Sequence, residues 1–224
     1  MNPDTENKEH HNPLHDHELE HEEVHEVLVF LRRNGMNIAI AIAIGVVAAL
    51  GGIFYRNSQT QKKMYAAKAL AAAQSLEALQ AVQSDFGGTP AAKVAQLEQA
   101  AEQFASGDYA AARASYQSFI KENPGHDIAK ALPVCVALCH EALGEQVQAL
   151  EASRAFLAKN PDHFMAPAAI FLQARVLGAE GKLDEARALY EEFIAENQDS
   201  LWKDQAQSAL RELNRLIRAD IASR

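Results

Sequence analysis

The sequence predicts an all-α protein in which one membrane-spanning helix precedes an α-solenoid of three helix-turn-helix repeats. An uncharged segment of 20 residues, "MNIAIAIAIGVVAALGGIFY", lies at 36–55. Further along, Gly107, Gly144 and Gly181 follow one another at intervals of 37 residues. Most of the net charge lies before the uncharged segment. The chain is therefore expected to divide into a charged tail, an anchor and a nearly neutral repeat domain.

Residues 1–31 form an acidic, histidine-rich tail. They contain nine acidic residues and one lysine, and so hold −8 of the formal net charge of −9, together with six of the nine histidines. The tail spells the zinc-protease pattern HExxH twice, at 17–21 and 21–25. In a zinc peptidase this pattern lies on a helix within a catalytic domain, where the histidines bind the metal and the glutamate activates water. A tail of 31 residues is too short to form such a domain.

Three histidines of the tail share one face if 16–31 is helical. His17, His21 and His25 are then spaced by four residues, which is compatible with loose binding of zinc or nickel. The alternative is a solvated charged helix with an apolar edge that leads towards the membrane or a partner helix. We favour the charged helix and assign no metal site.

No other part of the chain indicates an enzyme. It contains no Gly-rich phosphate-binding loop and no Ser-His-Asp or Cys-His arrangement. No region has an excess of basic residues, which argues against nucleic acid as a partner. We therefore expect no enzymatic activity, no catalytic residues and no cofactor.

Residues 32–56 are predicted to be a transmembrane anchor with its apolar core at 36–55. At about 1.5 Å per residue, this core matches a bilayer interior of roughly 30 Å. A cleaved signal peptide is the alternative, but its apolar core is usually about 7–15 residues and is not preceded by a long acidic segment. Basic residues flank the anchor on both sides, so they do not decide its orientation.

Residues 57–88 are predicted to be a linking helix. The stretch 57–85 is rich in Ala, Gln, Leu and Lys, and no Pro or Gly interrupts it before Gly87. Thr89 and Pro90 then have the features of an N-cap and a first helical residue. The repeat domain occupies the rest of the chain, with copies at about 89–125, 126–162 and 163–199 within 89–224, and a capping helix at 200–218.

The three copies align without gaps as "GDYAAARASYQSFIKENP", "GEQVQALEASRAFLAKNP" and "GKLDEARALYEEFIAENQ". Each is expected to place its glycine in the turn, alanines where the two helices approach closely and a phenylalanine against the neighbouring pair. Asn-Pro is expected to end the second helix, with Gln198 in place of proline in the third copy. These residues are Ala100, Ala137, Ala174, Ala112, Ala149, Ala186, Phe119, Phe156, Phe193, Asn123, Asn160 and Asn197. No pair can bury its apolar stripe alone, so the copies must stack.

These repeats resemble the tetratricopeptide repeat family. The glycine, the alanine five residues on, Tyr116 or Tyr190, and Pro124 or Pro161 fall where that family places them. The first helices depart from it, because its usual Trp and Tyr are replaced by Gln96, Pro133, Ile170, Gln103, His140 and Leu177. The resemblance implies a concave groove suited to peptides or partner helices. First-helix side chains such as Lys130, Gln173 and Arg175 are examples of groove candidates.

Two cysteines and two further histidines in the repeats have structural interpretations. Cys135 and Cys139 lie four residues apart on a predicted first helix, and we expect them to fill the core rather than form a disulfide or bind a metal. His126 and His163 lie one period apart after the Asn-Pro boundaries, where a role at the start of a helix is expected.

The whole architecture, a tail, one anchor, a linking helix and about three divergent repeats, is similar to that of the ancillary subunit family of the bacterial Sec translocon. The resemblance implies a single-pass protein of the bacterial inner membrane with a cytoplasmic N-terminus and periplasmic repeats. It implies translocon subunits, periplasmic chaperones and peptide segments as protein partners, with lipid contacting only the anchor. The alternatives are a scaffold for another envelope complex, such as division or outer-membrane assembly machinery, and a metal-binding tail protein.

Overall fold

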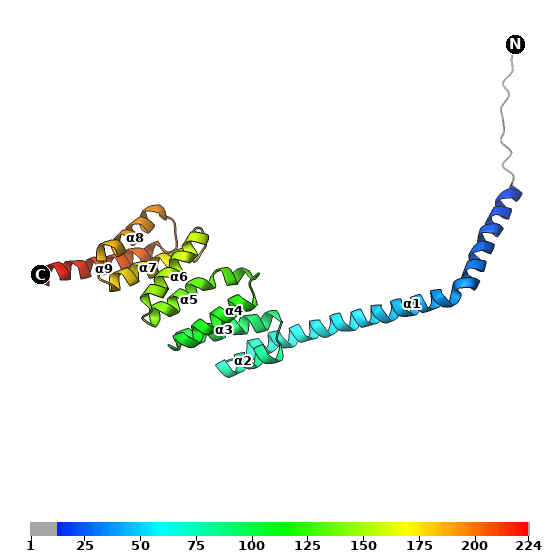
Figure 1. Ribbon diagram of the computed structural model, residues 1–224, viewed down its shortest axis with the longest axis horizontal. Helices are drawn as coiled ribbons and strands as arrows, with labels where there is room; N and C mark the ends of the chain where they lie inside the picture. The colour runs from blue at the N-terminus through cyan, green and yellow to red at the C-terminus, as the bar shows by residue number, and fades with distance from the viewer. Residues whose placement is uncertain (1–12, 224) are drawn as a thin grey trace, which may run out of the picture. The chain divides into compact units, whose positions relative to one another are not determined.

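The computed structural model describes the backbone of residues 13–223 and, within that range, the side chains of Val29 and of 32–219. The described chain is helical throughout and contains no strand (Figure 1). It divides into two compact units, Met1–Gln61 and Lys62–Arg224. Helix α1 (Pro13–Ala72) passes from the first unit into the second. The all-α fold class is therefore confirmed.

The first unit consists of the N-terminal part of α1. Among the described residues, one helix is long and apolar enough to cross a membrane, at Arg32–Ala72, and its most apolar window has a mean hydropathy of 2.4 with no residue buried. Large apolar side chains along the predicted anchor are exposed, including Ile44 and Phe54. His17, His21 and His25 belong to the helical part of the backbone, but their side chains lie outside the described residues.

The linking helix does not run through to residue 85 as predicted. Helix α1 ends at Ala72, and α2 (Leu76–Asp85) begins after a three-residue break. The Ser75 side chain caps α2 by accepting a hydrogen bond from the backbone N–H of Ala78 at 3.2 Å. Helix α2 then runs back along the end of α1. The contact between them is visible at Lys62, whose Nζ donates to the carbonyl oxygen of Gly87 at 3.2 Å.

The reason for the break is burial. On α2, Leu79 and Val82 pack with Ala95 of the next helix and with Leu70 near the end of α1. An uninterrupted helix would carry this apolar surface away from the repeats and into water. No glycine or proline marks the break, and a lone serine is the only local feature that indicates it.

Three helical hairpins follow at the predicted period. They are α3 (Pro90–Ala105) with α4 (Tyr109–Glu122), α5 (Leu132–Ala142) with α6 (Gln146–Lys159), and α7 (Ala166–Ala179) with α8 (Leu183–Glu196). A short 3-10 helix, η1 (Asp127–Lys130), precedes α5. Helix α9 (Lys203–Ser223) begins 37 residues after α7 and packs on α8. It occupies the place of the first helix of a further repeat, and it extends beyond the predicted end at residue 218.

The turns within the hairpins depend on glycine. Gly107, Gly144 and Gly181 have φ angles of 86°, 76° and 79°, in the left-handed region that other residues rarely adopt. The prediction for these three positions is therefore confirmed.

Asparagine, rather than the Asn-Pro pair, ends each second helix. The Nδ2 atoms of Asn123, Asn160 and Asn197 donate to the carbonyl oxygen four residues earlier at 3.2, 3.2 and 3.0 Å. Asn197 is followed by Gln198, yet α8 ends in the same way as the two helices followed by proline. The same carbonyl oxygens also accept from the backbone N–H of each asparagine, at 2.9, 2.9 and 3.0 Å, so each asparagine closes the last turn with two groups and proline is not required.

The core follows the repeat. The six predicted alanines are at most 1% exposed, and Phe119, Phe156 and Phe193 are at most 3% exposed. Each phenylalanine lies in a cluster with residues of the following first helix: Phe119 with Leu132, Phe156 with Ala169, and Phe193 with Ala206. These contacts join each hairpin to the next helix.

Phe193→Ala is expected to lower the free energy of unfolding by about 3–5 kcal/mol, because it removes a buried ring and leaves a cavity beside α9. The matched control is Phe164→Ala, since Phe164 is 70% exposed and a surface substitution changes stability by about 0.5 kcal/mol or less. Chemical denaturation followed by the fluorescence of Trp202, the only tryptophan, measures both. Equal losses in the two variants would contradict the assignment of Phe193 to the core.

Candidate interaction surface

The first helices α5 and α7 contact each other and carry a forked ion pair between them. Arg175 Nε and Nη2 donate to the two carboxylate oxygens of Glu141, each at 2.7 Å. Among the groove candidates named from the sequence, Arg175 is thus exposed, but its guanidinium is already paired with Glu141. Gln173 is buried, and the ammonium of Lys130 lies 3.1 Å from Asp127 within η1. The structure does not bring the three candidates together in one groove.

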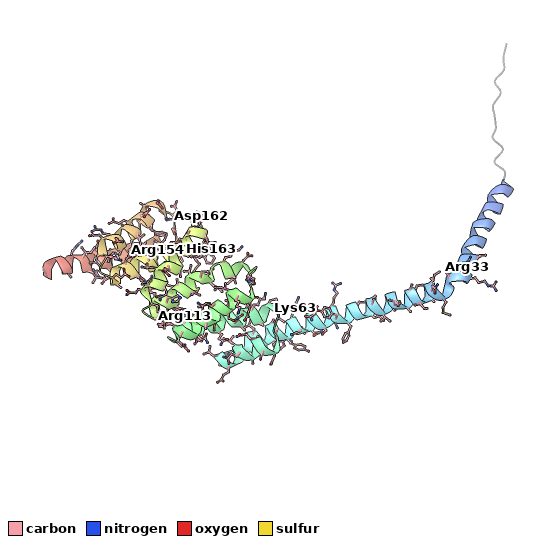
Figure 2. The ribbon with its side chains drawn as sticks, viewed as in Figure 1. Arg33, Lys63, Arg113, Arg154, Asp162 and His163 are labelled. Atoms are coloured by element: carbon pink, nitrogen blue, oxygen red, sulfur yellow. The ribbon has the colours of Figure 1, made fainter. Side chains whose placement is uncertain are left out.

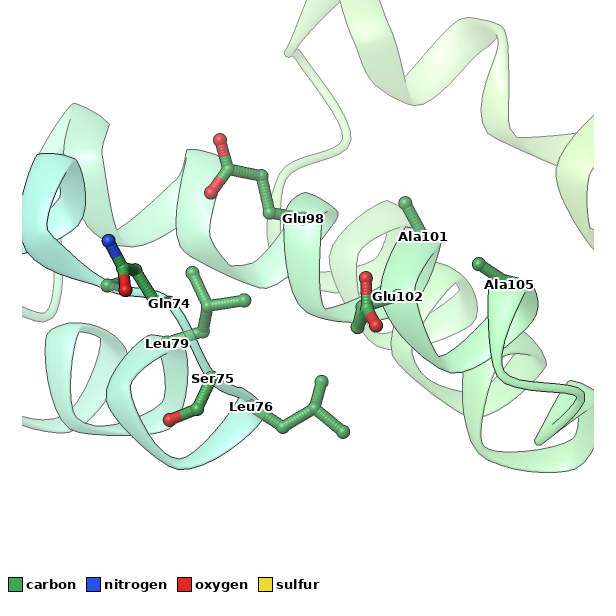
Figure 3. A pocket seen from close by; sticks show the side chains of 9 residues that line it. Gln74, Ser75, Leu76, Leu79, Glu98, Ala101, Glu102 and Ala105 are labelled. Atoms are coloured by element: carbon green, nitrogen blue, oxygen red, sulfur yellow. The ribbon is translucent and has the colours of Figure 1, made fainter.

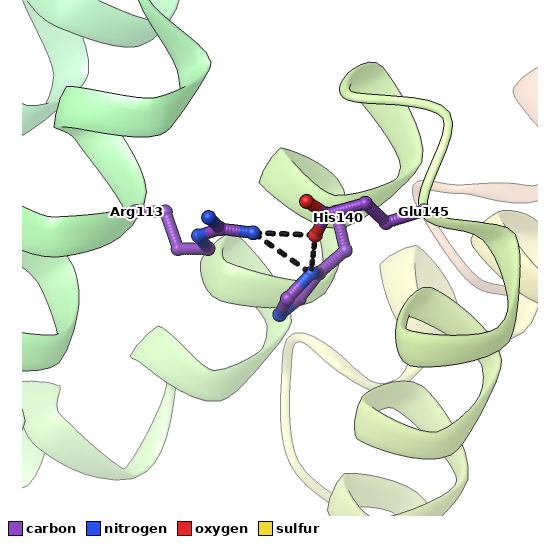
Figure 4. Close-up of polar contacts among 3 residues, drawn as sticks. All are labelled: Arg113, His140 and Glu145. Atoms are coloured by element: carbon purple, nitrogen blue, oxygen red, sulfur yellow. Dashed lines mark hydrogen bonds and ion pairs between the residues drawn. The ribbon is translucent and has the colours of Figure 1, made fainter.

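A second polar cluster joins the first two repeats. Arg113 of α4 contacts Glu145 and lies 3.2 Å from Nδ1 of His140, which also contacts Glu145 (Figure 4). The hydrogen bond with His140, and then the charge of Arg113, hold the pKa of the Glu145 carboxyl below its usual value. The three groups pair with one another across two repeats, so they stabilise the joint and present no free group for catalysis.

The two cysteines fill the core as predicted. Cys139 is fully buried beside Tyr116, Cys135 packs against the same cluster, and neither forms a disulfide. Burial raises the pKa of both thiols, that of Cys139 to about 11. Burial likewise raises the pKa of Tyr116 to about 12. At neutral pH the cysteines are therefore protonated, whereas a nucleophile or a metal ligand requires the thiolate.

His126 caps the 3-10 helix η1 that precedes α5, and His163 holds the turn just before α7, so both lie near the start of a first helix, as the sequence indicates. Their Nδ1 atoms accept hydrogen bonds from the backbone N–H two residues later, at 3.3 and 3.1 Å. Their rings pack edge-on against Phe119 and Phe156. One period after His163, the Ser200 hydroxyl accepts from the backbone N–H of Trp202 at 3.2 Å. This role of Ser200 was not predicted from the sequence, although its spacing of 37 from His163 indicates it.

An open groove, here called the α3 groove, lies at the start of the solenoid. It has a volume of about 570 Å³ and is lined by the α1–α2 connection and by the C-terminal half of α3, including Leu79, Glu98 and Glu102 (Figure 3). Helix α2 has 10 residues and the other second helices have 14, so this part of α3 stays uncovered. One period later the two glutamates are replaced by the partly buried Cys135 and the buried Cys139. Because the short α2 leaves this part of α3 in contact with water, α3 can carry carboxylates at positions that are apolar in the next repeat.

A larger groove, here called the loop groove, lies between the α6–α7 and α8–α9 connections. Its volume is about 670 Å³, and its lining includes Phe164, Ile170, Phe193, Leu201 and Trp202. Phe164 is 70% exposed and Leu201 is 100% exposed. Figure 2 labels the neighbouring Asp162 and His163 in the α6–α7 connection. Large apolar side chains exposed together on a soluble surface are typical of protein-binding sites.

Within the described residues no group of three or more His, Cys, Asp or Glu side chains is arranged to hold a metal ion. The histidines of the HExxH copies are not covered by this statement, because their side chains are not described.

Comparison with known proteins supports a repeat fold. A family model described as a tetratricopeptide repeat-like domain matches residues 29–215. The chain is similar to a tetratricopeptide repeat protein from Parabacteroides merdae, with 17% identity and a TM-score of 0.49 over 70% of this chain and 60% of that one. It is also similar to two crystal structures of TPR-like repeats from Podosopora anserina, each at 19% identity, with TM-scores of 0.47 and 0.46, covering 73% and 71% of this chain and 92% and 91% of theirs. No curated protein sequence matches the chain.

The lowered pKa of Glu145 predicts a pH-dependent contribution to stability. A carboxyl whose pKa is depressed on folding stabilises the protein above its unfolded pKa of about 4.3, and this stabilisation is lost as the pH falls through the lowered folded value. Glu145→Gln is therefore expected to unfold more readily than the wild type at about pH 7, with the difference shrinking between about pH 5 and pH 3. Denaturation midpoints across this range measure it.

The control for this prediction is Glu151→Gln, which changes an exposed carboxyl of α6 that forms no ion pair with a described residue. It is expected to leave the midpoint close to that of the wild type. A loss in Glu145→Gln that stays constant from neutral to acidic pH would show that the charge of Glu145 does not stabilise the joint.

Proposed function

Because the chain belongs to the tetratricopeptide repeat-like domain family, whose fold is typically a non-catalytic scaffold for protein–protein interaction, we propose that it is a membrane-anchored scaffold of the bacterial cell envelope. The observation that carries the proposal is the combination of this repeat domain with a long apolar helix in one chain. The side chains of that helix are exposed along the predicted anchor, as lipid contact requires.

The scaffold is placed beside the Sec translocon in this proposal. The support is the similarity in architecture to the translocon's ancillary subunit family: an acidic tail, one anchor and a short divergent solenoid. In that arrangement the N-terminus is cytoplasmic and the repeats are periplasmic. The repeats would then contact translocon subunits, periplasmic chaperones and segments of secreted chains, while only the anchor contacts lipid.

The structure offers suitable contact surfaces for such a role. The loop groove exposes large apolar side chains, and the turns that position them are held by side-chain hydrogen bonds at His163 and Ser200. A rigid apolar surface loses little conformational entropy when a partner binds. The alternative partners, components of division or outer-membrane assembly machinery, would use the same topology and the same surfaces.

A periplasmic repeat domain makes a direct prediction. An alkaline phosphatase reporter fused after Arg224 is expected to be active in intact cells, because the enzyme requires the oxidising compartment. The matched control is the same reporter fused after Gly35, before the apolar core, which is expected to be inactive. An inactive fusion after Arg224, with the full-length fusion protein present in the membrane fraction, would reverse the orientation and remove the translocon proposal with it.

Partner identity is tested separately. The full chain, purified in mild detergent after cross-linking in cells, is expected to bring down Sec translocon subunits in amounts well above those recovered with a chain cut after Gln61. Quantitative mass spectrometry of the two samples measures the difference. Recovery of division or outer-membrane assembly proteins in place of Sec subunits would favour the alternative scaffold.

A further inference from the structure

Two exposed apolar side chains of the loop groove occupy the same position in successive repeats, and they are called its walls here. Phe164 and Leu201 lie 37 residues apart, in successive connections that follow second helices. Both side chains are highly exposed, at 70% and 100%, and the buried Phe193 and the partly buried Ile170 and Trp202 also line the groove. Leaving apolar area in water forgoes about 25 cal/mol per Å² of stabilisation, so burial of this surface by a partner is favourable.

The walls of the groove are preorganised. The Phe164 ring lies on the His163 ring with centroids 4.5 Å apart, and the His163 ring packs edge-on against the buried Phe156 at 5.4 Å. On the other side, Trp202 packs against the ring of Phe171 at 6.0 Å. The exposed aromatic wall is therefore supported from the core, which limits the entropy lost on binding.

Carboxylates border the apolar surface. Asp162 and Glu196 are both exposed and line the groove, and neither forms an ion pair with any residue whose side chain the structure describes. His163 is the only lining residue that can carry a positive charge. Complementarity then calls for lysine or arginine on the partner, next to the group that fills the apolar centre.

We propose that the loop groove binds an extended peptide segment in which a bulky apolar side chain is flanked by lysine or arginine. The inference rests on the proposed scaffold function and specifies one class of its ligands. The groove volume of about 670 Å³ holds one large side chain and its neighbours, and the groove is open along its length as a continuous chain requires. It has no buried converging polar groups of the kind that orient a small molecule.

A second copy of this chain is the main competing occupant. Helix α9 carries the partly exposed Leu216 between Arg215 and Arg218, which is itself an apolar and basic segment. Self-association through this segment would make the protein dimeric and would depend on the same groove. The test therefore measures the oligomeric state together with peptide binding.

The experiment uses the full chain in nanodiscs and a fluorescein-labelled peptide with a Leu-Phe-Leu centre and two lysines on each side, followed by fluorescence anisotropy. Replacing both walls, in Phe164→Ser with Leu201→Ser, is expected to weaken binding by about tenfold or more. Replacing both carboxylates, in Asp162→Asn with Glu196→Gln, is expected to weaken binding by about threefold and to reduce its dependence on salt.

Two substitutions outside the groove serve as matched controls. Val147→Ser changes a 61% exposed apolar side chain of α6, and Glu151→Gln changes an exposed carboxyl of the same helix. Both are expected to bind the peptide as the wild type does. A peptide with glutamates in place of the lysines is expected to bind about tenfold more weakly or not at all.

Three outcomes would overturn the proposal: no saturable binding of the basic peptide, equal binding by wild-type and groove variants, or a dimer that the groove variants dissociate. The same variants are carried through the cross-linking experiment. If Sec subunits are recovered with the wild type while peptide binding fails, the loop groove proposal falls and the scaffold function stands. If the peptide binds in the groove but no envelope partner is recovered, the loop groove proposal stands and the proposed scaffold function falls.

Discussion

The contact between the phenylalanine of each second helix and the first helix of the following repeat is the interaction on which this structure depends. Phe119, Phe156 and Phe193 are buried, and each lies in a cluster with residues of the next first helix. A hairpin by itself would leave this ring in water, so each repeat requires its neighbour. Each end of the series must then be closed by a helix that packs on the last repeat and has no further repeat packed on it. Helix α9 does this at the C-terminal end, and the hairpin of α1 and α2 does it at the other.

The repeats share a period but are not interchangeable, because each joint has its own polar contacts. Arg113, His140 and Glu145 meet at the first joint, and one period later the same positions hold Leu150, Leu177 and Lys182. The second joint has the pair of Glu141 and Arg175, and one period earlier those positions hold Phe104 and Leu138. A stack in the wrong order would leave charges without partners, which is costly where they are partly buried.

The same packing determines where the molecule can bind a partner. Contacts between repeats bury the alanines, the phenylalanines and Cys139, and Cys135 is partly buried beside them. Burial raises the pKa of both thiols, which keeps them protonated at neutral pH. The connections that follow the second helices are held by side-chain caps and remain at the surface. Two of them present the exposed Phe164 and Leu201, so the proposed binding surface lies at the edge of the solenoid rather than on its first helices alone. The long apolar helix belongs to the other unit of the chain, and the proposed scaffold uses it as a membrane anchor.

Periodicity and turn chemistry were enough to predict the fold from the sequence, because each glycine, alanine, phenylalanine and asparagine of the repeat has a local or nearest-neighbour role. An uncharged segment of 20 residues likewise indicated the apolar helix by length alone. The break at Ala73–Ser75, the shared role of Asn197 without proline, and the two grooves were decided only in the tertiary structure. Each of these depends on which surface a distant helix covers. A short α2 leaves α3 open, and connections 37 residues apart meet only when the hairpins stack.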